Sequence, residues 1–208
     1  MVSPRALGAA LVEGLLSLAS PPRCAACDER VAARVVFCPA CARTVERAPA
    51  GASAPFLYGG ALARAIHRFK YEDATHLARP LGELLRHAPV PVVGLSVVVP
   101  VPLHPRRLAQ RGFNQAALLG DAIARAWSLP MNVTALSRVR DTSRQAALER
   151  DARLTNVDGA FHTAHSMVGH HVLLVDDVAT TGATLRACAA SLTAAGAKVR
   201  NLVLAVAL

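Results

Sequence analysis

One stretch near the carboxyl end of the chain constrains the fold more than any other. Residues 172–175 read Val-Leu-Leu-Val, Asp176 and Asp177 follow, and the turn at 180–182, Thr-Thr-Gly, opens a helical pattern. Backbone N–H groups at a helix N-terminus bind anions, and threonine hydroxyls supply further donors. A glycine lets the backbone approach the anion closely. Two carboxylates before it suit a ribose diol with a divalent cation nearby, although carboxylates at a strand end also cap helices. The stretch therefore predicts a site for a ribose 5-phosphate group.

The rest of the chain alternates apolar runs with helical patterns. The runs predict strands at residues 95–101, 133–139, 171–176 and 199–206, and the periodic segments predict helices at 60–71, 75–87, 114–127 and 182–195. Uniformly apolar strands that alternate with helices indicate an α/β fold, a doubly wound parallel sheet covered on both faces. Ligands of such sheets bind beyond the carboxyl ends of the strands, where Asp176 and Asp177 lie.

Four cysteines near the amino end form two Cys-x-x-Cys pairs, Cys24 with Cys27 and Cys38 with Cys41. Two such pairs complete a tetrahedral Zn²⁺ site and leave no open position for catalysis, so the expected zinc is structural. Disulfide bonds are the alternative, which a reducing compartment disfavours. Several arginines surround the pairs, so this small module either contacts nucleic acid or presents a solvated rim.

We expect three parts along the chain. These are an N-terminal amphipathic helix at 1–22, a four-cysteine zinc module at 23–47 and, after a boundary rich in Ala, Pro, Gly and Ser, a larger domain at 56–208. The apolar run at 6–19 is too short to cross ~30 Å of hydrocarbon, and Glu13 interrupts it. A signal peptide is the alternative to a helix, but leucines recur there at helical spacing. We expect a cytoplasmic protein without a membrane span.

The balance of charge points to an anionic partner. The chain has 23 Lys and Arg against 14 Asp and Glu, a net charge of +9, and Lys70 and Lys198 are its only lysines. Phosphorylated small molecules and nucleic acids both fit this charge. Hydrophobic residues make up 53%, which excludes a disordered chain, and aromatic residues only 4%, which leaves few side chains for base stacking.

The stretch 172–184 resembles the binding signature for 5-phosphoribosyl 1-diphosphate (PRPP) in type I phosphoribosyltransferases, where four apolar and two acidic residues precede a Thr-Thr-Gly-x-Thr loop. The resemblance implies that the domain at 56–208 is phosphoribosyltransferase-like. It implies that Asp176 and Asp177 are catalytic residues that bind the ribose hydroxyls of PRPP, with Mg²⁺ as cofactor. It also implies that the 5-phosphate lies on the loop of Ala179, Thr180, Thr181, Gly182, Ala183 and Thr184.

Segments 98–115 and 140–161, together with four cysteines after an N-terminal helix, resemble the ComF family of competence-associated phosphoribosyltransferase-like proteins. The resemblance implies that pyrophosphate is held by Arg106, Arg107 and Arg111. It also implies a closing loop with Arg140, a further catalytic candidate, and Arg144. We expect only some of these five arginines to touch the ligand, because any one of them can be a solvated surface residue.

The ComF resemblance implies a PRPP-binding protein that supports DNA uptake in natural transformation. Single-stranded DNA and a helicase of the uptake machinery are the partners it implies. Two alternatives stay open: an active phosphoribosyltransferase with an unknown acceptor, and a PRPP-sensing regulator without turnover. Thr180 stands where salvage enzymes of the hypoxanthine type carry an acidic residue, so we do not expect purine salvage chemistry.

Overall fold

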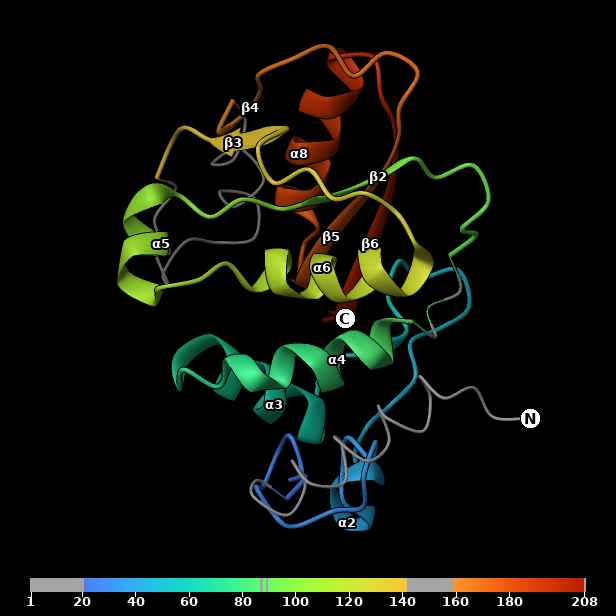
Figure 1. Ribbon diagram of the computed structural model, residues 1–208, viewed down its shortest axis with the longest axis vertical. Coiled ribbons are helices and arrows are strands. Elements are labelled where there is room, and N and C mark those ends of the chain that lie inside the picture. Colours follow the sequence, from blue (N-terminus) through green and yellow to red (C-terminus); the bar gives the residue numbers. More distant parts are fainter. Residues whose placement is uncertain (1–20, 87, 89, 142–158, 208) are drawn as a thin grey trace, which may run out of the picture.

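A computed structural model describes residues 21–86, 88, 90–141 and 159–207 (Figure 1). Residues 1–20 of the expected N-terminal helix and the part of the expected closing loop that contains Arg144 lie outside the described residues. Within the described ranges, no helix combines the length and the apolar character needed to cross a membrane.

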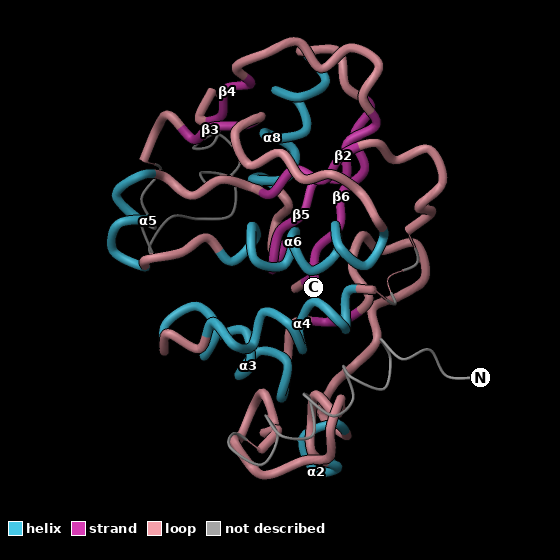
Figure 2. The backbone as a smooth tube through the Cα atoms, in the orientation of Figure 1, coloured by secondary structure: helices cyan, strands magenta, loops and turns pink. Residues whose placement is uncertain are grey.

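The core of the fold is a parallel sheet, as predicted: three of its four strands correspond to predicted apolar runs, and the short strand at 56–57 was not predicted (Figure 2). In order across the sheet the strands are β1 (Phe56–Leu57), β6 (Lys198–Val206), β5 (His171–Ala179) and β2 (Val97–Pro100). Residues 172–175 of β5 are fully buried. A strand buried on both faces carries a continuous apolar run, which is why this segment does not alternate with polar residues.

Helices cover both faces of the sheet, which confirms the doubly wound architecture. They are α3 (Gly60–Tyr71), α4 (Ala78–Leu85) and α6 (Gln115–Trp127) on one face and α8 (Ala183–Ala194) on the other. Leu173 and Val175 of β5 belong to the core beneath the first group, and Val172 and Leu174 belong to the core beneath α8. Side chains alternate along a strand, so one apolar run supplies both layers.

The strand expected at 133–139 is shorter than predicted and lies outside the main sheet. β3 (Leu136–Arg138) pairs antiparallel with β4 (Phe161–Thr163) in a separate two-stranded sheet. The side-chain oxygen of Asn132 accepts hydrogen bonds from the backbone N–H groups two and three residues further on. This Asx turn leads the chain away from β2 before β3 begins, which explains the difference.

Most helices begin and end close to their predicted bounds. α3 has the predicted bounds, and the helix expected at 75–87 begins as the 3₁₀ turn η1 (Thr75–Leu77) and continues as α4. α5 (Pro105–Arg111) was not predicted, because its proline-rich start is also typical of a turn. The side chain of the N-cap residue His104 accepts a hydrogen bond from the backbone N–H of Arg106. Pro105 follows it, and proline is favourable at the first helical position.

Candidate functional site

Asp176 and Asp177 lie within β5, beyond the point where the neighbouring strand β2 has ended. β5 pairs with β2 as far as Val175 and with β6 as far as Ala179, so the strand extends past the predicted end. Successive side chains of a strand point to opposite faces of the sheet. Asp177 therefore lies on the α3 side, and it is only 6% exposed. Asp176 lies on the α8 side and is partly buried.

Lys70, near the end of α3, forms an ion pair with Asp177. Its Nζ lies 2.7 Å from Asp177 Oδ1, and both side chains are largely shielded from solvent. The backbone N–H of Asp177 in turn donates to Asp176 Oδ1 at 2.8 Å, so the three groups form one connected cluster. Sequence reasoning did not assign Lys70 to the site, because only the tertiary fold brings α3 to β5. The sequence feature that could have singled out Lys70 is the scarcity of lysine, since the chain has two lysines among its 23 Lys and Arg.

The surroundings of Asp176 favour its protonated form. Burial and, after it, the neighbouring Asp177 carboxylate raise the pKa of Asp176 from 3.8 to about 7, although Lys70 and Arg138 act in the opposite direction. Cys188 of α8 lies on the same side, and burial raises the pKa of its thiol far above the usual range. The pair therefore consists of Asp177, which is bonded to the Lys70 ammonium, and Asp176, which exchanges its proton readily near neutral pH.

The loop between β5 and α8 has the geometry of a tight turn into a helix. Gly182 is the N-cap of α8 with φ +70°, in the left-handed region that favours glycine. The hydroxyl of Thr181 accepts a 3.4 Å hydrogen bond from the N–H of Ala183, and its carbonyl accepts one from Arg186 at 2.8 Å. Both donors belong to α8, so these bonds hold Thr181 against the start of that helix.

A cavity of about 600 Å³ opens beside the acidic pair, between the end of β5, α3, α5 and the start of α6. Five predicted site residues line it: Arg107, Arg111, Asp176, Asp177 and Thr184. The other five members of the predicted phosphate loop, residues 179–183, lie outside the lining. Arg106 and Arg140 are exposed and also lie outside it. The fold therefore brings together the acidic pair, one loop threonine and two of the arginines.

Helix α5 and the start of α6 form a basic wall of this cavity. Arg111 donates to the side-chain oxygen of Gln115 at 2.7 Å, and its guanidinium lies 5.0 Å from the ring centre of Tyr71. Arg107 Nε lies 3.7 Å from a carboxylate oxygen of Asp141. Gln115 is 2% exposed, and its Nε2 has no hydrogen-bond partner among the described residues. An unsatisfied buried donor is unfavourable, so a ligand with an acceptor atom that reached Gln115 Nε2 would gain a hydrogen bond without breaking another.

The four cysteines of the two Cys-x-x-Cys pairs converge on one point. Their sulfur atoms all lie within 4.8 Å of one another, with those of Cys27 and Cys38 3.7 Å apart. A tetrahedral site with Zn–S bonds of ~2.3 Å needs sulfur separations of ~3.8 Å, so this donor set fits a metal ion such as zinc. All four are free thiols without a disulfide. Burial opposes ionisation of Cys24, but backbone N–H donors together lower its pKa to about 6, which favours a thiolate ligand.

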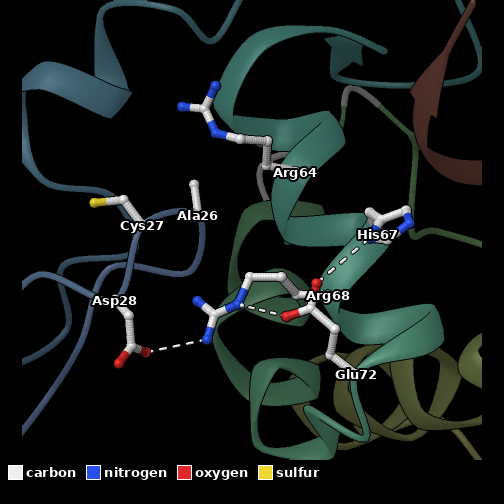
Figure 3. Close-up of a pocket in the computed structure, with 7 residues that line it drawn as sticks. All are labelled: Ala26, Cys27, Asp28, Arg64, His67, Arg68 and Glu72. Carbon is white, nitrogen blue, oxygen red and sulfur yellow. Dashed lines mark hydrogen bonds and ion pairs between the residues drawn. The ribbon is translucent and has the colours of Figure 1, made fainter.

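The cysteine module, residues 23–47, packs against α3 (Figure 3). Arg64 donates to the sulfur of Cys41 at 3.6 Å. Arg68 donates to the carbonyl of Ala25 at 3.1 Å and to the carboxylate of Asp28 at 3.0 Å. These groups surround a second cavity of about 450 Å³. The lining of this second cavity comes from the module and from α3, so the cavity lies where the two parts pack against each other.

Comparison with known proteins identifies relatives along most of the chain. The family model for the phosphoribosyl transferase domain matches residues 114–207. DNA utilization protein YhgH of Salmonella typhimurium is 30% identical over 181 residues, which cover 78% of this chain and 80% of that protein. Competence protein F of Haemophilus influenzae is 35% identical over 129 residues, which cover 58% of this chain and 56% of that protein.

Among solved structures, the glutamine PRPP amidotransferase of B. subtilis, complexed with ADP and GMP, is similar to this chain with a TM-score of 0.43 and 22% identity. The similarity covers 62% of this chain and 26% of that one. The acidic pair, the loop and α8 all lie inside the matched segment 114–207, whereas Lys70, α3 and the cysteine module lie before it.

Proposed function

The chain belongs to the ComF family of phosphoribosyltransferase-like proteins, and on that premise we propose that its larger cavity binds PRPP with Mg²⁺ and that the protein supports the uptake and use of DNA. One observation carries the proposal: the acidic pair, Thr184 at the start of α8 and a basic wall line a single cavity. These are the acceptors and donors that a ribose diol flanked by two phosphate groups requires.

The ligand fits this cavity in one direction. Its 5-phosphate takes the N–H groups and hydroxyls of the loop at the start of α8, residues 179–184. Its ribose hydroxyls donate to Asp176 and Asp177. Its diphosphate lies toward Arg107 and Arg111 of α5, with Nε2 of Gln115, which has no partner within the described part of the chain, as a further donor. Each end of the ligand then meets charge of the opposite sign.

The same arrangement suits phosphoribosyl transfer. When the bond between the anomeric carbon and the diphosphate weakens, positive charge develops on the ribose and negative charge on the leaving group. The carboxylates stand on the ribose side and the arginines on the diphosphate side, so both charges are stabilised by groups already in position. Mg²⁺, when bound, neutralises part of the diphosphate charge.

Two further parts of the proposal concern the rest of the chain. We assign the four-cysteine cluster to a structural zinc ion, because four thiolates leave no coordination position open for substrate. We also assign single-stranded DNA and a helicase of the uptake machinery as partners, and a cytoplasmic location. The net charge of +9 and the names of the relatives support the DNA assignment.

A chromosomal replacement tests whether the cavity serves the DNA function. The host would carry the double variant Asp176→Asn, Asp177→Asn. The measurement is the frequency of transformation or, in a host that uses DNA as a nutrient, the rate of growth on DNA. We expect a loss of at least about tenfold, since both negative charges that strengthen the hydrogen bonds from the ribose hydroxyls are removed. Lys198→Ala, a change of an exposed lysine away from the cavity, is the control and should leave the frequency unchanged. A double variant that folds and keeps the full frequency would contradict the proposal.

A further inference from the structure

The contact between Lys70 and Asp177 joins a segment outside the matched domain to the candidate ribose site. Lys70 lies on α3, before the matched residues 114–207, and its Nζ reaches Asp177 Oδ1 at 2.7 Å inside the larger cavity. We propose that Lys70 is a positioning residue of the ribose site: it holds one oxygen of the Asp177 carboxylate and leaves the other for a ribose hydroxyl. The inference rests on the proposed function and adds a residue to its site.

Two adjacent carboxylates need a cation nearby to stay ionised together. Asp176 and Asp177 are consecutive, both are shielded from water, and a ligand with two phosphate groups brings more negative charge to them. Like charges in such surroundings favour uptake of a proton, which turns an acceptor into a donor. The ammonium of Lys70 opposes the rise in the pKa of Asp176, and its contact with Oδ1 fixes the orientation of the Asp177 carboxylate.

The other charged groups near the pair are placed for different contacts. Arg138 of β3 lies near Asp176 and lowers its pKa, and Asp176 in turn raises the pKa of the Cys188 thiol on α8. Arg107 of α5 lies toward Arg138 and contacts Asp141. Lys70 is the cation of α3 that bonds directly to Asp177, and no other element of the described residues forms an ion pair with this carboxylate.

The backbone beneath Lys70 is held firmly, which a positioning role requires. Leu62, Ile66 and Phe69 of α3 are almost completely buried in the core. The ring of Phe69 lies 5.8 Å from that of Phe113, in the segment between α5 and α6. On its other side α3 is bonded to the cysteine module through Arg68 (Figure 3). Lys70 can therefore change its rotamer, but its Cα cannot move away from the cavity without disturbing this packing.

Titration calorimetry with ribose 5-phosphate tests the inference, because this probe engages the carboxylates and the phosphate loop without a diphosphate. We compare the wild-type chain with Lys70→Met, Lys70→Arg and the control Lys198→Met. Lys70→Met should weaken binding about tenfold or more, as expected for loss of a charged partner, whereas Lys70→Arg should restore most of the affinity. Lys198→Met should bind like the wild type.

A pH series separates positioning from a merely structural effect. Lys70 lowers the pKa of Asp176, so loss of the ammonium should raise it, and the midpoint at which affinity falls on acidification should move upward in Lys70→Met. A destabilised but otherwise normal site would lose affinity equally at every pH. If Lys70→Met bound ribose 5-phosphate as tightly as the wild type and with the same pH midpoint, the inference would be overturned, and the proposed function would stand. A wild-type chain that binds neither ribose 5-phosphate nor PRPP would overturn the proposed function and the inference with it.

Discussion

Asp176 and Asp177 are neighbours in the chain but occupy different environments, and the difference determines what each can do. Asp177 is paired with Lys70 on the α3 side of the sheet. Asp176 lies on the α8 side, where burial and the charge of Asp177 raise its pKa to about 7. A ribose diol therefore meets one carboxylate that is fixed by a cation and one carboxyl group whose charge depends on pH.

The raised pKa of Asp176 predicts a pH-dependent cost to stability. The folded chain binds this proton more tightly than the unfolded chain, so stability is fully present below the ordinary value of 3.8 and is lost as the pH rises toward 7. At pH 8 the uncharged variant Asp176→Asn should be more stable than the wild type by about 1–3 kcal/mol, because one pKa unit corresponds to about 1.4 kcal/mol and solvent screens part of the effect.

Thermal unfolding between pH 5 and 8 measures this effect. The wild-type transition should fall relative to that of Asp176→Asn as the pH rises, and the two curves should approach each other at pH 5. Parallel curves for the two proteins across the series would show that Asp176 has no raised pKa.

At the scale of elements, the parts that can be predicted from the sequence are those whose signal is local. Leu62, Ile66 and Phe69 recur at helical spacing, so α3 was predicted with its observed bounds. The apolar run at 172–175 likewise indicated β5. The contact of Lys70 with Asp177 could not be predicted in this way, since it depends on how α3 packs against the sheet. Nor could the turn at Asn132, because side-chain capping there competes with extension of the strand.

The turn into α8 gives a prediction at this scale. Gly182 has φ +70°, and a Cβ there would lie 3.1 Å from Arg186 Nη1. Gly182→Ala should cost about 1–2 kcal/mol of stability, because the left-handed conformation is strained for other residues. It should also weaken ribose 5-phosphate binding, since the loop would shift to relieve the strain.

A second glycine provides the matched control for that variant. Gly169 has φ +80° with open space around the position of a Cβ, and it lies outside the lining of the larger cavity. Gly169→Ala should lower the melting temperature in a similar way and leave ribose 5-phosphate binding unchanged. If both variants bound the ligand equally well, the loop would not be the phosphate seat.

At the scale of the whole molecule, α3 connects the two candidate sites. Its Arg64 and Arg68 bond to the cysteine module, and its Lys70 bonds to the acidic pair. Buried cysteines of the module also belong to the same core as α3, α4 and α6. The module is therefore part of the packing that supports one wall of the larger cavity. Loss of metal from the cysteine cluster should affect the stability of the module and of that wall.

Metal analysis and thermal unfolding test this connection. The purified chain should contain about one zinc ion, as expected for a single four-thiolate site. The variant Cys24→Ser, Cys27→Ser, or removal of the metal by a chelator, should lower the melting temperature by several degrees. Cys188→Ser changes the one cysteine outside the cluster and should keep the metal content. A metal-free chain with unchanged thermal stability would contradict a structural role for the metal.

The central claim is that one cavity, with the acidic pair at one end and the basic wall at the other, binds PRPP. Titration calorimetry of the full chain with PRPP and Mg²⁺ tests it most directly, with the folded double variant Asp176→Asn, Asp177→Asn as the comparison. The account predicts binding of one PRPP per chain that the double variant loses. Absence of binding to the wild-type chain, or equal binding to both proteins, would contradict it.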